Sequence, residues 1–345
     1  MRRVLVMEGP KKIGFREYQD EPLKPNEVRV RTLYSGISAG TQLTLYRGKN
    51  PFNEKHFDRE KRIFTPAESE NLLYPNVGAW GYEEVGEVCE LGSQVEKVKP
   101  GQIVYGTWGH RESNVVTEEF ALEHTLPGDL NPIVGIYSQM GAIALNAVLD
   151  ADIHIGETVA VFGQGVPGQI VAQLARLNGA RVIAVDMNEW RLEMSKKLGA
   201  DITLNPDKCD VAMEIKNITG QGVDKAIEIS GSPYALHEAI RSTVYNGRVV
   251  CSGFIVGEAR GLFLGDEFHH NRINIVCSQI DGINPSISNS WNRLRMEKTI
   301  MDLALRKDLD LESLITHIVP FDQADRAYAM LDEAREDCLQ VVLKF

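Results

Sequence analysis

The stretch VAVFGQGVPGQI, residues 159–170, decides the fold of this chain. A short apolar run leads into Gly163-x-Gly165-x-x-Gly168, and an apolar segment with helical spacing follows. Between a strand and a helix, Gly163 permits a tight turn and Gly165 lets a ligand approach the backbone. Gly168 lets the helix pack closely on the strand. The stretch therefore predicts the first turn of a dinucleotide-binding domain.

Residues around this turn complete the predicted cofactor site. Val166 and Pro167 open the helix, where a proline loses no hydrogen bond and the free N–H groups favour phosphate. Asp186 ends the next predicted strand, where a carboxylate accepts hydrogen bonds from ribose hydroxyls and repels a 2′-phosphate. We therefore expect NAD as the cofactor rather than NADP. The remaining residues assigned to this site are Arg191, Ser230 and Gly231. The alternative is a glycine turn and a capping Asp with no ligand.

The chain after about residue 155 alternates between predicted strands and helices. The strands are expected at 158–163, 181–186, 223–230 and 248–253, and the helices at 169–180, 188–201 and 232–247. Gly179, Gly199 and Gly247 fall where C-terminal helix caps belong. Alternation with short connections predicts an α/β fold with a parallel, doubly wound sheet.

The chain before residue 125 shows a different pattern of short β-like runs separated by Gly and Pro. They are RVLVM (3–7), EVRVRTLYSG (27–36), GYEEVGEVCELG (81–92), GQIVYG (101–106) and EEFALE (118–123). Many short strands without helices between them predict a barrel-like β unit. After residue 282 we expect a helix over 289–308, a second helix capped by Asp322, and a closing strand over 339–345.

Composition narrows the possible partners and the compartment. The formal net charge of −11 argues against binding to a nucleic acid backbone, which needs a basic surface. The N-terminal apolar run is too short for a signal peptide, and we expect no membrane-spanning segment. An odd, dispersed set of five cysteines fits a reducing compartment. We therefore expect a cytoplasmic protein that acts on a small molecule.

Several blocks together resemble the medium-chain dehydrogenase/reductase superfamily, in its zinc-type alcohol and polyol dehydrogenase group. They are SGIS (35–38), GYEEVGEVCELGSQVEKVKPGQIV (81–104), VFGQGVPG (162–169), VIAVD (182–186) and LITHIVPFDQADRAYAMLDEA (314–334). The finer pattern, SGISAGTQLTLYRG followed by YPNVGAWGYEEVG, is similar to a branch that includes bacteriochlorophyllide dehydrogenase-like proteins.

The resemblance implies a discontinuous GroES-like β-barrel domain and a Rossmann domain that binds NAD. It places residues 1–136 and 282–345 in the first domain and residues 137–281 in the second. It also implies a homodimer or a higher homo-oligomer that pairs through the apolar segment 272–279.

The zinc ligands of that family are replaced in this chain. The positions of the family's Cys, of the His in its GHE motif, and of its next Cys or Asp look like Ser38, Tyr82 and Ser138. Zinc needs thiolate, imidazole or carboxylate ligands, and neutral hydroxyls bind it poorly. The four-cysteine structural lobe is also missing between residues 85 and 125. We therefore expect no metal.

Without zinc, hydroxyl and imidazole groups must stabilise the oxyanion and move the proton. Tyr82, as a phenol of lowered pKa, is predicted to donate to the carbonyl oxygen. Ser38 and Thr41 are predicted to bond the same oxygen or relay a proton, and His110 is a further catalytic candidate. Two alternatives stay open: Tyr82 fills the space left by the metal, and His110 is a surface or capping residue.

These features predict zinc-independent, NAD-dependent hydride transfer between NAD(H) and a secondary alcohol or ketone. The substrate would be a polyol, a sugar derivative or a secondary metabolite. A zinc-free quinone or enone reductase and a non-catalytic NAD-binding protein are the alternatives. Residues 49–75 form an excursion that is longer than in typical relatives, and it is either a solvated surface segment, a lid or a subunit contact.

Overall fold

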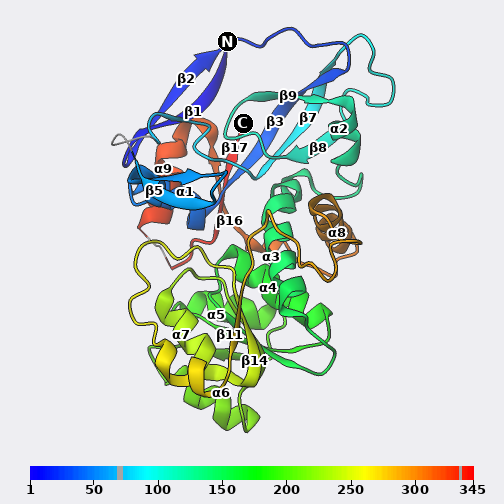
Figure 1. Ribbon diagram of the computed structural model, residues 1–345. Helices are drawn as coiled ribbons and strands as arrows, with labels where there is room; N and C mark the ends of the chain where they lie inside the picture. Colours follow the sequence, from blue (N-terminus) through cyan, green and yellow to red (C-terminus); the bar gives the residue numbers. More distant parts are fainter. Residues whose placement is uncertain (68–72, 334–335) are drawn as a thin grey trace. The chain divides into compact units, whose positions relative to one another are not determined.

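The computed structural model, drawn in Figure 1, describes residues 1–67, 73–333 and 336–345. Its contacts divide the chain into two compact units. Unit 1 comprises residues 1–139 and 315–345, and unit 2 comprises residues 140–314.

The boundary of unit 2 differs from the one we expected, because residues 282–314 belong to it and not to the first domain. Helix α8 (Arg293–Leu305) packs against α3 (Tyr137–Ala151): a β-carbon on Gly141 would lie 2.5 Å from Cγ2 of Ile300. Gln173 exchanges hydrogen bonds of 3.0 and 2.9 Å with the backbone of Asp310. These contacts join the segment to unit 2, and chain order does not reveal them.

Unit 2 is built on a parallel sheet which, in the described residues, has six strands in the order β12-β11-β10-β13-β14-β15. The strands are β10 (Thr158–Phe162), β11 (Arg181–Val185), β12 (Ile202–Leu204), β13 (Val223–Glu228), β14 (Thr243–Cys251) and β15 (Asn274–Cys277). The order reverses between β10 and β13, which is the switch point where doubly wound sheets bind ligands. The predicted doubly wound sheet is confirmed.

The helices between these strands are α4 (Val166–Leu177), α5 (Glu189–Lys197), α6 (Val211–Thr219) and α7 (Pro233–Ser242). Gly179 and Gly199 follow α4 and α5 with φ of +88° and +104°, as predicted for helix ends. The prediction for Gly247 is wrong. Helix α7 ends at Ser242, and Gly247 lies inside β14, where the β-branched start of that strand (Thr243-Val244) favours extended backbone.

Unit 1 contains the second large sheet, in which β17 lies between β16 and β3. Its order is β16-β17-β3-β7-β8, with β9 also paired to β3. These strands are β3 (Glu27–Ile37), β7 (Glu84–Leu91), β8 (Ile103–Gly106), β9 (Ser113–Thr117), β16 (Ile315–Pro320) and β17 (Gln340–Lys344). A smaller sheet joins β1 (Arg2–Gly9), β2 (Lys12–Tyr18) and β6 (Asn76–Val77).

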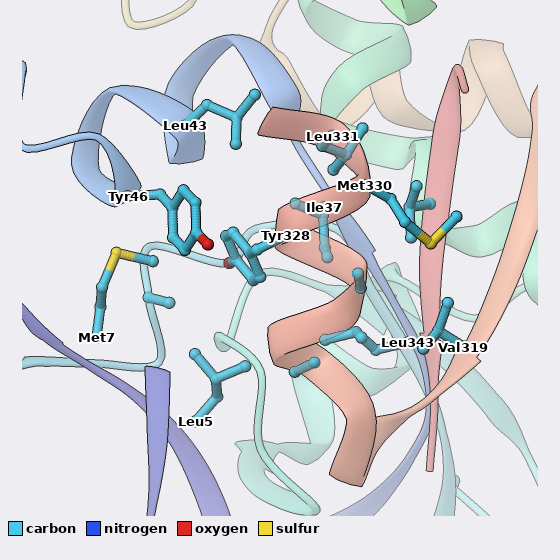
Figure 2. Packing of buried hydrophobic residues seen from close by; sticks show 14 of the residues in the cluster. Leu5, Met7, Ile37, Leu43, Tyr46, Val319, Tyr328, Met330, Leu331 and Leu343 are labelled. Carbon is cyan, nitrogen blue, oxygen red and sulfur yellow. The ribbon is translucent and has the colours of Figure 1, made fainter. Parts of the chain in front are cut away.

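Two helices of unit 1, α1 (Ala39–Tyr46) and α9 (Ala324–Asp332), meet in its core, as Figure 2 shows. The rings of Tyr46 and Tyr328 lie 5.4 Å apart between them, and Leu5 and Met7 of β1 pack in the same cluster. This packing fixes α1, which begins directly after Ser38. The predicted N-cap of the last helix is wrong by one residue: Asp322 lies in the short turn η5 (Phe321–Gln323), and Gln323 precedes α9.

The run EEFALE, which we expected as a strand, is helix α2 (Glu118–Glu123). The Thr117 hydroxyl accepts a hydrogen bond of 3.2 Å from the Phe120 amide, and Glu118 and Glu119 occupy the first turn. A side-chain cap with acids behind it stabilises a helix start, and a six-residue apolar pattern cannot distinguish a helix from a strand.

One segment meets the length and hydropathy of a membrane span, contrary to our expectation that none would. It covers Pro132–Ala151, which is the short turn η2 (Pro132–Ile136) followed by α3. Its most apolar window is 83% buried inside the protein, as the core helix of a globular protein would be.

Candidate active site

The glycine turn lies between β10 and α4, and two of its three glycines, Gly163 and Gly168, have no room for a side chain. Gly163 has a φ of +98°, and a β-carbon there would lie 2.7 Å from Cβ of Ser230. A β-carbon on Gly168 would lie 1.9 Å from the Gly163 carbonyl oxygen. Around Gly165, by contrast, the nearest atom is 3.8 Å away, in Pro167. A side chain at Gly165 would therefore enter open space that a phosphate can occupy.

The N-terminus of α4 differs from those of the helices that follow it. Its N-cap is Gly165, which offers no side chain to the first N–H groups, and Val166 and Pro167 form the first turn. Helices α5, α6 and α7 are instead capped by the side chains of Asn188, Asp210 and Ser232. The free N–H groups and positive end of α4 therefore suit an anionic ligand, so the residues present fit the dinucleotide.

Asp186 follows β11 and lies beside the glycine turn. Its Oδ2 accepts a hydrogen bond of 2.6 Å from the Gln164 amide, and its Oδ1 accepts one of 2.8 Å from the Asn188 amide. Two backbone donors thus hold a partly exposed carboxylate next to the loop. Arg191 lies in the first turn of α5, where its amide donates to Asn188 Oδ1 at 3.1 Å.

Ser230 and Gly231 form a second loop at the same edge of the sheet, after β13. The Glu228 Oε1 atom accepts hydrogen bonds from the Ser230 amide (2.7 Å), the Ser230 hydroxyl (2.5 Å) and the Gly231 amide (2.9 Å). The close approach of Ser230 to Gly163 brings the two loops together. Glu228 was not among the predicted site residues, although an acid at the end of an apolar strand is a signal that could have identified it.

The hydroxyl groups predicted to act in catalysis meet in unit 1. The oxygens of Ser38 and Tyr82 lie 2.5 Å apart, and Thr41 Oγ1 lies 3.1 Å from the Tyr82 oxygen. Ser38 is the N-cap residue of α1, but its side chain does not cap that helix and contacts Tyr82 instead. Three hydroxyls in one group form a path along which a proton can pass.

The expected lowering of the Tyr82 pKa is wrong. Burial raises the pKa of Tyr82 to about 12, the nearby Glu83 carboxyl raises it further, and the hydrogen bonds from Ser38 and Thr41 oppose the change only in part. Desolvation disfavours the phenolate, so the neutral phenol is the stable form. Tyr82 therefore stays protonated and can donate a hydrogen bond.

The replaced ligand positions do not fit zinc. Tyr82 is held as a neutral phenol, Ser38 is occupied by it, and the buried Ser138 in the first turn of α3 offers another neutral hydroxyl. Across residues 1–67, 73–333 and 336–345, no group of three His, Cys, Asp or Glu side chains is placed to hold a metal ion. The donor set that zinc prefers is therefore not assembled at these positions.

His110 is completely buried, so the surface alternative for it is wrong. Its Nδ1 lies 2.6 Å from the Ser35 hydroxyl, and its Nε2 lies 2.8 Å from Gln42 Oε1. The Tyr328 hydroxyl also donates to Gln42 Oε1 and lies 3.2 Å from His110 Nε2. Burial lowers the pKa of His110 to about 3, so the ring is neutral. His110 thus contacts Ser35, Gln42 and Tyr328, and its catalytic role stays a prediction.

The two residues that follow Tyr82 in the sequence, Glu83 and Glu84, carry fully buried carboxyl groups. Glu84 accepts hydrogen bonds from the Ser35 hydroxyl at 2.9 Å and the Trp108 amide at 2.7 Å. Glu83 Oε2 accepts one of 3.2 Å from Gln340. Burial raises the pKa of Glu83 to about 8 and that of Glu84 to about 7.

These acids were not predicted as site residues. The signal for them was the pair Glu83-Glu84 at the start of an apolar strand pattern, where charged residues are rarely buried. Their partners Ser35, Trp108 and Gln340 are far apart in the sequence, and no spacing pattern connects them.

Comparison with known proteins gives relatives along the whole chain. Residues 167–294 match the family described as zinc-binding dehydrogenase. The chain is 32% identical to D-guloside 3-dehydrogenase of Escherichia coli (strain K12) over 349 residues, which covers 99% of each protein. It is 30% identical to (R,R)-butanediol dehydrogenase of Bacillus subtilis (strain 168), over 77% of this chain and 80% of that one.

Solved structures share the fold over nearly the full length. A 2R,3R-butanediol dehydrogenase from Bacillus subtilis covers 100% of both chains with a TM-score of 0.78 at 23% identity. A zinc-binding dehydrogenase from Sinorhizobium meliloti 1021, bound to NADP, gives 0.79 at 22%, and covers 100% of this chain and 99% of that one. An alcohol dehydrogenase from Escherichia coli CFT073, in complex with NADH, gives 0.78 at 21% with the same coverage.

The two units therefore have the GroES-like and Rossmann architectures of these dehydrogenases. The full-length relatives and the shared fold show that the chain is an enzyme and belongs to the medium-chain dehydrogenase/reductase superfamily, in its zinc-type alcohol and polyol dehydrogenase group.

Proposed function

We propose that this enzyme interconverts a secondary alcohol and a ketone with NAD(H) and without a catalytic zinc ion. The observation that carries the proposal is the contact of the Tyr82 hydroxyl with Ser38 and Thr41, at the positions where the family resemblance places zinc ligands. A phenol that donates a hydrogen bond can stabilise the developing oxyanion, which is the task of the metal in a zinc dehydrogenase.

In the reducing direction, Tyr82 donates its proton to the carbonyl oxygen of the ketone. Its raised pKa keeps that proton in place until the oxygen gains negative charge. The Ser38 and Thr41 hydroxyls hold the phenol in position, and after the reaction they relay a proton from water to the phenolate. In the oxidising direction the proton moves the opposite way through the same hydroxyl groups, and the alcohol proton passes to Tyr82.

Unit 2 is proposed to bind the cofactor, which supplies the hydride chemistry. Solved neighbours contain NADP and NADH, which supports a nicotinamide cofactor. The choice of NAD rests on Asp186, whose carboxylate lies beside the glycine turn and would repel a 2′-phosphate. Gly163, Gly165 and Gly168 would accommodate the pyrophosphate, with Val166, Pro167, Arg191, Ser230 and Gly231 around it.

The proposed substrate is a secondary alcohol of a polyol or sugar derivative. The names of two relatives state substrates of this kind, a D-guloside and a butanediol. Neither name favours a quinone or enone substrate, and both disfavour a non-catalytic role. We further propose a cytoplasmic homodimer or higher homo-oligomer.

The test combines a metal assay with an activity assay on the untagged protein. Methyl D-guloside and 2,3-butanediol are offered with NAD and with NADP, with and without a strong chelator. We expect turnover with NAD, no loss on chelation, and far less than one zinc per chain by elemental analysis. One zinc per chain together with inhibition by the chelator would disprove the zinc-free chemistry.

A further inference from the structure

A small hairpin in unit 1 carries two aromatic side chains, the exposed Phe64 and the partly buried Phe57. Its strands, β4 (Lys55–Asp58) and β5 (Ile63–Pro66), pair only with each other in the described part of the chain. Residues 68–72 of the predicted excursion lie outside the described residues. Phe64 is 46% exposed and Ile63 is 53% exposed. An isolated two-stranded hairpin is marginally stable in water, so other contacts must hold it.

Those contacts are a row of aromatic rings that ends at Trp80. Phe57 and Phe64 face each other across the hairpin, with ring centroids 4.9 Å apart. Phe64 is 5.5 Å from Phe52, and Phe52 meets Trp80 edge-on at 6.4 Å. Trp80 is two residues before Tyr82. We call Phe52, Phe57, Phe64 and Trp80 the aromatic row.

The backbone under Trp80 is strained. Ala79 and Trp80 have φ of +49° and +56°, in the left-handed region that residues with a β-carbon rarely adopt. Such a conformation persists where the surroundings impose it, often at functional sites. These two residues lie shortly before Tyr82 in the chain, with Gly81 between Trp80 and Tyr82.

Hydrogen bonds connect Phe52, the member of the aromatic row next to Trp80, to the helix that carries Thr41. The Thr44 hydroxyl donates to the Thr41 carbonyl at 2.7 Å, and Asn50 Nδ2 donates to the Thr44 hydroxyl at 2.8 Å. The Asn50 Oδ1 atom then accepts from the Phe52 amide at 3.0 Å. The buried Asn50 therefore links Phe52 to α1. Phe52 is thus connected to the helix that carries Thr41, and Trp80 lies two residues before Tyr82 in the chain.

We propose that the aromatic row is a subsite for the ring of a sugar, so that the substrate is a secondary alcohol of a glycoside in its pyranose form. The apolar C–H face of a pyranose packs on exposed aromatic rings, while its hydroxyl groups stay in contact with water and polar side chains. The exposed Lys55 lies two residues before Phe57, on the same face of the hairpin, and provides a polar neighbour. This inference rests on the proposed function and names its substrate class.

A small ligand fits this surface better than a protein partner. A stable protein interface buries about 800 Å² on each side, drawn from some 20–30 residues. The hairpin contributes eight strand residues, half of which are charged or polar. Few, close aromatic rings beside polar groups are instead typical of a small-molecule site.

The test compares three single substitutions in the intact enzyme. Phe64→Ala removes a ring, Phe64→Tyr keeps it, and Ile63→Ala removes an equally exposed apolar side chain that points to the other face of the strand. For methyl D-guloside we expect Phe64→Ala to raise KM about tenfold with little change in kcat, as loss of one stacking partner predicts. The other two variants should match the parent, and KM for 2,3-butanediol should not change in any of them.

Two results would overturn the sugar subsite. One is a KM for methyl D-guloside in Phe64→Ala within twofold of the parent value. The other is a changed molecular mass by light scattering without a change in KM, which would make the hairpin a subunit contact. If neither alcohol is turned over with either cofactor, the proposed function fails separately. Calorimetric binding of methyl D-guloside then tests the subsite by itself. We expect binding to the parent and a Kd about tenfold higher for Phe64→Ala. Equal Kd values, or no detectable binding to the parent, would contradict the subsite.

Discussion

Replacing Tyr82 with Phe tests whether its hydroxyl takes part in the reaction or only occupies space. The substitution removes one oxygen and keeps the ring, so packing is nearly unchanged. The substitution therefore removes the hydrogen bonds of the Tyr82 hydroxyl with Ser38 and Thr41. If Tyr82 is the proton donor, turnover should fall by roughly 10²–10⁴-fold, the usual contribution of a general acid–base group.

The pKa of Tyr82 adds a signature that a space-filling role would not produce. With a pKa of about 12, a fraction of roughly 10⁻⁴ of the hydroxyl is ionised at pH 8. Ketone reduction uses the protonated phenol, so its rate should be flat between about pH 6 and pH 9. Alcohol oxidation uses the ionised form, so its rate should rise by about tenfold per pH unit over the same range.

The assay is kcat in both directions against pH, with Kd for NAD measured alongside. Tyr46→Phe serves as the control, because Tyr46 is a core tyrosine that contacts Tyr328 and none of the three hydroxyl groups. Cofactor affinity should be unchanged in both variants, since the glycine turn belongs to unit 2. A loss under about threefold in Tyr82→Phe, with the pH slope of oxidation retained, would refute the proton-transfer role.

Three further predictions concern the cofactor, stability and assembly. Asp186→Ser should narrow the preference for NAD over NADP, which fluorescence titration of NADH and NADPH checks; tighter binding of NADPH by the parent would contradict the role of Asp186. Burial raises the pKa of Glu84, so ionisation of this carboxyl destabilises the folded state. This destabilisation is absent below about pH 4.5 and grows until about pH 7. Glu84→Gln should therefore raise Tm at pH 8 and not at pH 4, and equal gains at both would exclude this cause. Ile275→Lys on the exposed edge strand β15 should convert the dimer to a monomer by light scattering; a parent that is already monomeric would rule out this assembly.

The Rossmann half of the fold was predictable because its signals are local. The glycine spacing after β10 and the alternation of apolar runs with helical segments follow from backbone chemistry within about 20 residues. The same local logic failed at Glu118–Glu123, where a capping threonine outweighs a short apolar pattern. It also failed at Gly247, which the sheet holds in an extended strand.

The catalytic unit was less predictable because its contacts join distant segments. Tyr82 meets Ser38 and Thr41 across about 40 residues, and His110 reaches Gln42 and Tyr328 over still longer separations. The family resemblance suggested the first group but gave the wrong direction for the Tyr82 pKa. Burial decides that direction, and residue spacing does not report it.

The position of β17 between β16 and β3 has a consequence for how the chain is made. Unit 2 is continuous, so all of it has been synthesised once residue 314 is added, whereas unit 1 lacks an interior strand until residue 344. About 200 residues separate its first segment from that strand, which takes roughly 10–40 s at ribosomal speed. During that time the end of β3 that pairs with β17 is an open sheet edge, prone to pairing with another nascent chain. Unit 1 is thus the last part to fold, and we expect chaperones that shield this edge to determine how much active enzyme a cell recovers.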